Sequence, residues 1–147
     1  MKIFAIVPVK RYENSKSRLS EILNVQERMY LSGLMLDDTL RALKASKCFE
    51  EILVVSSDSQ ARKMTQKRHA RFLDEGYDRD VNSAVKLADR YSIGKRADAT
   101  LVVPLDLPLM GPEDIAGVCK LAENVRECVV ICPSLRRDGT NILLRKP

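Results

Sequence analysis

Short apolar runs alternate along the chain with longer stretches in which apolar and polar positions recur at helical spacing. The apolar runs contain few polar positions and span residues 3–9, 52–57, 99–105 and 128–132. Strands of this kind are buried on both faces, which is typical of a mainly parallel sheet with helices on either side. The pattern therefore predicts a three-layer α/β/α domain with a mostly parallel sheet.

Capping residues and helical spacing predict helices between these strands. Asn24 and Glu27 form a capping-box variant, which predicts a long helix from Val25 to about Ser46. The apolar positions near helical spacing in this helix are Leu31, Leu34, Met35, Leu40 and Leu43. Shorter helices are expected over 59–67, 81–91 and 112–123, and weaker strand signals cover 71–73 and 141–144.

The 147 residues fit one domain with a substantial core, and no linker divides them. A net charge of +5 suits an acidic small molecule and does not by itself demand nucleic acid. No apolar run approaches the roughly 18 residues of a membrane span. Because the N-terminus also lacks a signal-peptide cleavage site, we expect a cytoplasmic protein.

Neither the cysteines nor the single histidine forms a pattern typical of a metal or nucleophile site. Cys128 and Cys132 lie on one apparent strand and about 13 Å apart, too far for two zinc–sulfur bonds of roughly 2.3 Å. His69 has no accompanying nucleophile pattern, so we expect it at the surface. A basic cluster could contact RNA but shows no aromatic stacking pattern: Arg62, Lys63, Lys67, Arg68 and Arg71.

The first apolar run leads directly into a basic segment. Residues 10–18 carry four cations and one carboxylate. Ligands of open α/β sheets bind beyond the carboxyl ends of the strands, so this loop is placed to hold an anion such as a polyphosphate. The glycine-based phosphate motifs are absent, so side chains must supply much of the positive charge, and Lys10, Lys16 and Arg18 are the candidates. A solvated basic loop is the alternative.

Asp106 follows the run 99–105 directly and so belongs to the same expected sheet edge. Mg²⁺ prefers one or two carboxylates together with phosphate oxygens, and one aspartate beside a cationic loop fits that preference. The alternative is a turn aspartate that precedes Pro108.

Two further segments carry polar candidates. Thr140 and Asn141 follow an Asp-Gly pair and would offer a hydroxyl and an amide to a second substrate, whereas the alternative is a hairpin turn. Asn82 would either read a base edge or cap a helix.

Together, these segments resemble the 2-phospho-L-lactate guanylyltransferases of coenzyme F420 biosynthesis over essentially the whole chain. The motifs that carry the resemblance are Ile6-Val7-Pro8-Val9-Lys10 with Ser15-Lys16-Ser17-Arg18-Leu19, Pro104-Leu105-Asp106-Leu107-Pro108-Leu109, and Asp138-Gly139-Thr140-Asn141. The resemblance implies a nucleotide-diphospho-sugar-transferase-like (GT-A-like) fold. It also implies transfer of GMP from GTP to 2-phospho-L-lactate or phosphoenolpyruvate, with release of pyrophosphate.

The resemblance implies roles for individual residues as well. Lys10, Lys16 and Asp106 would be catalytic, with Asp106 holding Mg²⁺ that is bound with GTP. The residues expected to bind the nucleotide are Pro8, Val9, Lys10, Lys16, Arg18 and Asn82. Thr140 would contact the phosphorylated acid, with Asn141 beside it. The expected partners are GTP and that acid rather than nucleic acid or membrane, and a homodimer is left open.

One departure from the family is visible. Its members usually continue into a segment with a Phe-Gly-x-x-Ser-like loop and a second metal-binding Asp, and this sequence contains neither. We therefore expect the single domain over 1–147 to lack the family's C-terminal segment and to hold a metal weakly. Two alternatives stay open: a nucleotidyltransferase of the same fold with a sugar-phosphate or molybdenum-cofactor-like acceptor, and a non-enzymatic basic binding domain.

Overall fold

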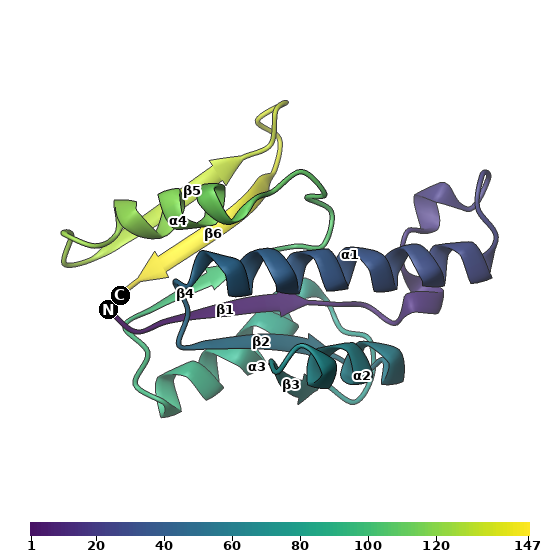
Figure 1. Cartoon of the computed structure of the whole chain (residues 1–147), viewed down its shortest axis with the longest axis horizontal. Helices are drawn as coiled ribbons and strands as arrows, with labels where there is room; N and C mark the ends of the chain where they lie inside the picture. Colours follow the sequence, from purple (N-terminus) through teal and green to yellow (C-terminus); the bar gives the residue numbers. More distant parts are fainter.

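The computed structural model describes all 147 residues and places one six-stranded sheet between two layers of helices (Figure 1). The strands are β1 (Ile3–Pro8), β2 (Glu51–Ser56), β3 (Arg71–Asp74), β4 (Ala99–Val102), β5 (Cys128–Pro133) and β6 (Thr140–Lys146). Their order is β3-β2-β1-β4-β6-β5. The first four pair in parallel, whereas β6 pairs antiparallel with both β4 and β5 and alone runs against the others. The prediction of a mostly parallel sheet is confirmed.

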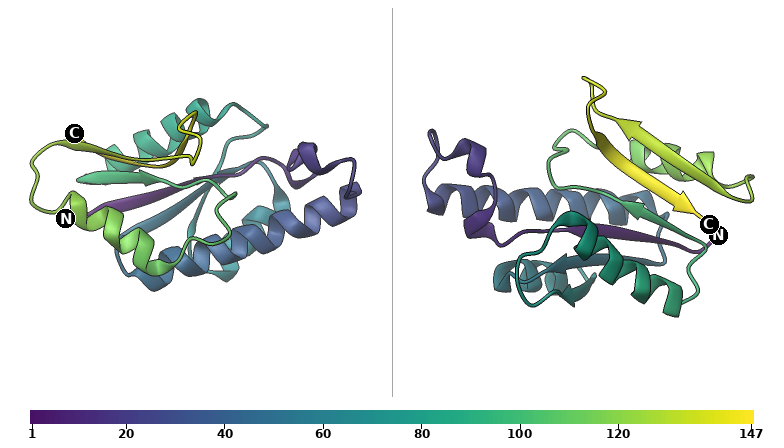
Figure 2. Two further views of the ribbon diagram at one scale, coloured as in Figure 1. Left: turned by 90° about the horizontal axis from the view of Figure 1, so that it is seen from above. Right: turned by 180° about the vertical axis from the view of Figure 1, so that it is seen from behind.

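The helices are α1 (Val25–Ser46), α2 (Ser59–Lys67), α3 (Val81–Gly94) and α4 (Pro112–Leu121), with two 3₁₀ turns, η1 (Tyr12–Asn14) and η2 (Ser17–Leu19). The helices α1, α2 and α4 contribute to the core on one face of the sheet, and α3 covers the other face (Figure 2). This arrangement confirms the predicted three layers. None of the helices combines the length and the apolar character that crossing a bilayer would require.

Strand β1 lies inside the sheet and explains the apolar run at the start of the chain. Phe4, Ala5, Ile6 and Val7 have no exposed surface. Ala5 and Val7 pack into the core beneath α1, whereas Phe4 and Ile6 pack in the cluster that includes residues of α3. Because alternate side chains enter different helical layers, both faces of the strand must be apolar.

Helix α1 begins at the predicted capping box, but its buried stripe differs from the predicted one. Asn24 Oδ1 accepts a hydrogen bond from the Glu27 N–H at 2.8 Å, and the Glu27 carboxylate accepts one from the Asn24 N–H at 2.9 Å. Leu36 is fully buried, whereas Leu34 is 46% exposed. Two positions along a helix are about 200° apart, so a face that buries Leu36 turns Leu34 toward solvent.

Strand β4 is shorter than the predicted run 99–105. It ends at Val102, and one more backbone bond joins the Val103 N–H to the Ile6 carbonyl at 2.9 Å. Pro104 has no N–H to continue the ladder, so pairing stops there. The chain leaves the sheet two residues before Asp106, which frees that residue from the strand.

Candidate functional site

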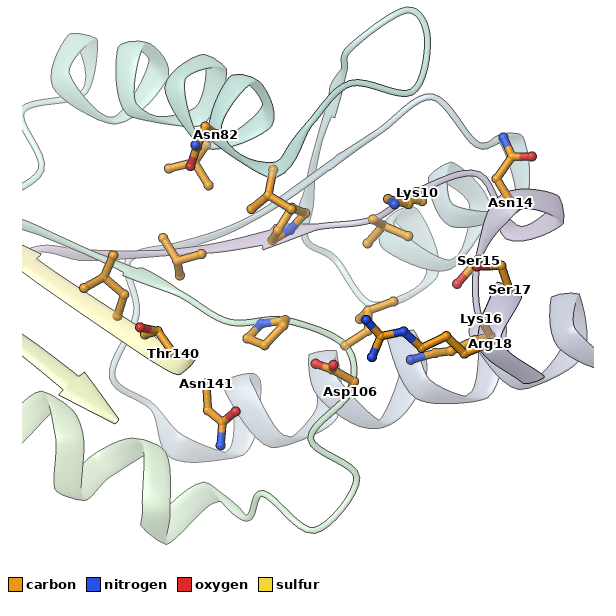
Figure 3. Close-up of a pocket in the computed structure, with 18 of the residues that line it drawn as sticks. Lys10, Asn14, Ser15, Lys16, Ser17, Arg18, Asn82, Asp106, Thr140 and Asn141 are labelled. Atoms are coloured by element: carbon orange, nitrogen blue, oxygen red, sulfur yellow. The ribbon is translucent and has the colours of Figure 1, made fainter. Parts of the chain in front are cut away.

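A cavity of about 680 Å³ opens at the carboxyl edge of the parallel strands (Figure 3). Its walls come from the loops after β1 and β4, the first turn of α3 and the strand β6. All the site residues nominated from the sequence line it: Pro8, Val9, Lys10, Lys16, Arg18, Asn82, Asp106, Thr140 and Asn141. The structure therefore gathers them at one place, while their individual roles stay predictions.

The sheet topology explains this gathering. Strands β1 and β4 are parallel neighbours, so the segments that carry Lys10 and Asp106 leave the sheet at the same edge. Strand β6 runs antiparallel to β4 with Leu143 opposite Val102, so Thr140 and Asn141 extend past the end of β4. Residues far apart in sequence thus meet beyond the carboxyl ends of the strands, where open α/β sheets bind ligands.

The loop after β1 is shaped by two 3₁₀ turns with a left-handed residue between them. Lys16 has φ 56° and ψ 34°, and it directly precedes η2. Of the non-glycine residues with positive φ, Lys16 alone lines the cavity. A non-glycine residue in this region is uncommon, and such conformations cluster at ligand sites.

The charges at the cavity are not neutralised by the protein itself. Lys10, Lys16 and Arg18, which we call the cationic wall, take part in none of the ion pairs of the structure, and neither does Asp106. Figure 3 shows the loop that carries the cationic wall on one side of the cavity, with Thr140 and Asn141 on the other. Three unpaired cations and one unpaired carboxylate leave the cavity net positive, which favours a polyanionic ligand.

Asp106, Thr140 and Asn141 form what we call the far wall. Asp106 is the only acidic residue that lines the cavity, and nowhere do three His, Cys, Asp or Glu side chains gather to hold a metal by themselves. Mg²⁺ is often held by one carboxylate together with substrate phosphates. The donor set therefore fits an ion that shares its coordination with a bound phosphate.

Two residues of the far wall, Thr140 and Asn141, directly follow the turn of a β-hairpin. The loop between β5 and β6 is closed by Ser134, whose hydroxyl donates to the Asp138 carboxylate at 2.7 Å and accepts from the Gly139 N–H at 3.2 Å. The left-handed residue of this turn is Arg137 (φ 57°) rather than the glycine. The two interpretations of Asp-Gly were thus not exclusive, because the hairpin turn is what presents Thr140 to the cavity.

Asn82 lines the cavity and does not cap α3. The N-cap is Asp80, whose carboxylate accepts from the Ser83 N–H at 2.9 Å, and that bond together with one from the Ser83 hydroxyl lowers the pKa of Asp80. The capping interpretation of Asn82 was therefore wrong. Its side chain is exposed in the first turn of α3, where it is free to meet a ligand.

Sequence reasoning missed Arg145, which also lines the cavity. Its guanidinium donates to both Asp89 carboxylate oxygens, at 2.7 and 2.9 Å, and to the Thr100 hydroxyl at 2.8 Å. The pair joins β6 to α3 across the back of the cavity. The only local signal was the alternation of β6, which places Arg145 on the same face as Leu143, another residue of the lining.

The remaining sequence candidates lie away from the cavity. His69 is exposed, and all four cysteines are free thiols. Most of the basic cluster on α2 and β3 is paired with carboxylates, through Arg62–Asp74, Arg68–Asp37 and Arg71–Glu51. The Arg68 guanidinium lowers the pKa of Asp37 by hydrogen bonding. These pairs leave less free positive charge on that surface than the sequence suggested.

Comparison with known proteins adds a family to this geometry. The family described as guanylyl transferase CofC-like matches residues 1–147. A phosphoenolpyruvate guanylyltransferase of Rubrobacter xylanophilus is 36% identical, over 100% of this chain and 70% of that protein. A 2-phospho-L-lactate guanylyltransferase of Methanothermobacter thermautotrophicus is 33% identical, over 100% of this chain and 63% of that protein. The chain thus spans roughly two thirds of the length of these relatives.

Solved structures agree on the fold. A protein of Desulfovibrio desulfuricans described as a nucleotide-diphospho-sugar transferase superposes with a TM-score of 0.77 at 16% identity, covering 99% of this chain and 64% of that chain. A CMP:2-keto-3-deoxy-manno-octonic acid synthetase in complex with CTP superposes with a TM-score of 0.65 at 11% identity, covering 99% and 74%. The expected nucleotide-diphospho-sugar-transferase-like fold is confirmed.

Proposed function

Because the chain belongs to the guanylyl transferase CofC-like family, we propose that it transfers GMP from GTP to the phosphate of a small phosphorylated acid. Phosphoenolpyruvate and 2-phospho-L-lactate, after which its relatives are named, are the acceptors that we propose. The observation that carries the proposal is that one cavity is lined by an unpaired cationic wall together with Asp106, Thr140 and Asn141.

The cationic wall is proposed to bind the triphosphate of GTP. A polyphosphate brings several negative charges, and Lys10, Lys16 and Arg18 have no carboxylate partner that it would have to displace. Pro8 and Val9 line the cavity where this loop begins, at the end of β1. Asn82 offers an amide near the start of α3. We assign the base to the α3 side, because the cationic loop takes the phosphates.

The chemistry needs positioning and charge stabilisation rather than a covalent intermediate. A phosphate oxygen of the acceptor attacks the α-phosphorus of GTP, and the bond from that phosphorus to the bridging oxygen of the β-phosphate breaks. Pyrophosphate leaves and takes the electron pair, so the cationic wall would stabilise the growing charge of the leaving group. The attacking phosphate is already ionised, so no general base is required.

Asp106 is proposed to hold Mg²⁺ that is bound with GTP. When bound, such an ion neutralises phosphate charge and makes the α-phosphorus a better electrophile. Asp106 supplies the only carboxylate of the cavity lining, so it is the residue that would hold such an ion. A single carboxylate predicts that binding of the metal depends on the nucleotide.

Thr140 and Asn141 are proposed to bind the acceptor. Their side chains offer an uncharged hydroxyl and amide, which can bind the acid without competing with the cationic wall for the triphosphate. We place this reaction in the cytoplasm and, from the motifs, in coenzyme F420 biosynthesis. The paired state of the basic cluster on α2 and β3 supports a nucleotide rather than nucleic acid as the partner.

The direct test is release of pyrophosphate by the 147-residue chain. GTP, ATP, CTP and UTP are each supplied with Mg²⁺ and with phosphoenolpyruvate or 2-phospho-L-lactate. We expect turnover with GTP that requires the acceptor. Asp106→Asn should lower kcat by about a hundredfold to a thousandfold, because it removes charge aimed at the reacting centre.

Glu113→Gln is the matched control, since Glu113 is an exposed acid on the first turn of α4, outside the cavity lining. It should react at the normal rate. Near-normal turnover in Asp106→Asn, or equal turnover with all four nucleotides, would contradict the proposal.

A further inference from the structure

Two carboxylates that do not line the cavity accept hydrogen bonds from the loop of residues 10–19, which we call the cationic loop. Asp78, from the segment between β3 and α3, accepts a hydrogen bond from the Arg11 N–H at 2.8 Å and another from Asn14 Nδ2 at 2.9 Å. Asp58, at the start of α2, accepts one from the Tyr12 N–H at 2.8 Å. The loop after β1 is therefore hydrogen-bonded to the segments that follow β2 and β3.

The two carboxylates differ in what else they do. Asp58 uses its other oxygen to cap α2, through the N–H groups of Gln60 and Ala61, so its position is set by that helix. Asp78 caps no helix, and both of its carboxylate oxygens are bonded to the cationic loop. Apart from one longer bond from the Ser57 hydroxyl, at 3.4 Å, the hydrogen bonds of Asp78 all go to the loop, which makes Asp78 the sharper subject for a test.

Asp78 also separates the cations of the loop into two groups. Arg11 Nε donates to the Ser57 hydroxyl at 3.1 Å, and that hydroxyl lies 3.4 Å from the Asp78 carboxylate. Arg11 does not line the cavity, whereas Lys10 on one side and Lys16 on the other do. These bonds hold Arg11 outside the cavity lining, to which Lys10 and Lys16 belong.

The bonds of Asp78 reach two parts of the cavity lining. Asn14, which it fixes, lines the cavity beside the cationic wall. Two residues after Asp78, the N-cap Asp80 begins α3, whose first turn carries Val81 and Asn82 into the lining. The cationic loop is thus hydrogen-bonded to the segment that leads into the α3 side of the cavity.

We propose that Asp78 is a positioning residue, which holds the loop of residues 10–19 in its phosphate-binding shape before the nucleotide arrives. This inference rests on the proposed function. It assigns to Asp78 an increase in phosphate affinity that comes from ordering the loop and not from touching the phosphate. Without it, binding would have to order an irregular loop that carries a left-handed Lys16, and that cost would reduce affinity.

The experiment compares Asp78→Ala with Asp74→Ala. Asp74 is a matched control, because this acid ends β3 four residues before Asp78. Its carboxylate accepts a hydrogen bond from the Gly76 N–H and pairs with Arg62, and it has no bond to the cationic loop. Amide hydrogen exchange is measured for peptides covering residues 10–19. Affinity is measured by titration with inorganic tripolyphosphate, which probes the loop without the base.

We expect Asp78→Ala to speed exchange across residues 10–19 and to weaken tripolyphosphate binding by about tenfold, the loss expected when a preformed site must be ordered. Asp78→Asn, which keeps one acceptor oxygen, should be intermediate, and Asp74→Ala should match the wild type in both measurements. A folded Asp78→Ala variant with unchanged exchange and affinity would overturn the proposal.

Thermal unfolding establishes whether Asp78→Ala is folded. If it is not, Asp78→Asn decides, and wild-type exchange in that variant overturns the proposal. The exchange measurement does not depend on turnover. Absence of pyrophosphate release by the wild type would therefore contradict the proposed function alone, while unchanged exchange would contradict the role of Asp78 alone.

Discussion

The two walls of the cavity are built in different ways. The cationic wall lies on an irregular loop that protrudes beyond β1 and is held by hydrogen bonds from loops 46 to 67 positions away in sequence. The far wall lies on the first residues of β6, inside the sheet ladder, and on the segment that leaves β4. Charge in the cavity lining follows the chain segments, because the unpaired cations lie on the loop after β1 and the only carboxylate lies on the segment that leaves β4.

This difference indicates that the two walls bind different substrates. A strand holds a hydroxyl and an amide at fixed positions, which suits a small acceptor that must be aligned for attack. A loop rich in cations can surround a larger polyanion, provided that other parts of the protein keep it ordered. Substitutions on the two walls should therefore affect different substrates.

The largest effect that is confined to one wall is expected at Lys16. Lys16→Gln removes a charge from the cationic wall and should weaken GTP binding by about thirtyfold, the loss of a charge-assisted hydrogen bond, with little change in the KM of the acceptor. Titration with GTP and steady-state kinetics measure the two quantities.

Lys47→Gln is the matched control for that prediction. Lys47 shares the left-handed conformation, with φ 56°, but ends α1 away from the cavity. A similar loss of GTP affinity in both variants would show that backbone conformation, rather than charge at the cavity, is responsible.

The next largest effect concerns the ion pair of Arg145 with Asp89, which joins β6 to α3. Asp89→Asn removes the carboxylate charge that pairs with the Arg145 guanidinium. Arg145 Nε is already buried without a hydrogen-bond partner. We expect the free energy of unfolding to fall by about 2 kcal/mol in denaturant titrations. Asp38→Asn, which breaks an exposed pair with Arg41, should change it by less than about 0.5 kcal/mol.

A smaller effect is expected on the far wall. Thr140→Val keeps the shape of the side chain and removes its hydroxyl, so the KM of the acceptor should rise by about fivefold while GTP affinity is unchanged. Thr140→Ser keeps the hydroxyl and should restore most of the acceptor affinity. An equal change in the affinity for GTP would remove the distinction between the walls.

The smallest expected effect is a dependence of protein stability on pH, through Glu75. Glu75 is only 5% exposed, and burial, followed by the charge of Asp78, raises its pKa above the usual value. A raised pKa means that ionisation disfavours the folded state, so this contribution to stability is full below about pH 4 and is lost as pH rises through the folded-state pKa.

Glu75→Gln should therefore raise the Tm at pH 7 and have no such benefit near pH 4. Exposed Glu21 provides the control, because Glu21→Gln should leave the Tm unchanged at both pH values. A lower Tm for Glu75→Gln at pH 7 would show that the carboxylate is stabilising where it is.

Local patterns predicted much of this fold. The apolar run of β1 and the capping box of Asn24 and Glu27 each depend on neighbours in sequence, and both predictions were confirmed. The residues of the cavity could be nominated because the ends of parallel strands meet at one edge. The stripe of α1 was misassigned at Leu34, because helical spacing fits more than one face and only packing selects between them.

The hydrogen bonds that shape the cavity could not be predicted in the same way. Asp78 meets Asn14 across 64 positions, and Arg145 meets Asp89 across 56. Nothing in the composition of either segment distinguishes a carboxylate that orders a loop from one that is solvated. Such contacts depend on strand order and on loop paths, which only the folded structure provides.

The most direct test of the account follows the phosphorus atoms of GTP. The 147-residue chain is incubated with Mg²⁺, phosphoenolpyruvate or 2-phospho-L-lactate, and GTP labelled with ³²P at either the α or the γ position. If the cationic wall holds the leaving pyrophosphate and the far wall holds the acceptor, the α label appears in the acceptor product and the γ label in pyrophosphate. Transfer of the γ label to the acceptor, or release of inorganic phosphate in place of pyrophosphate, would contradict it.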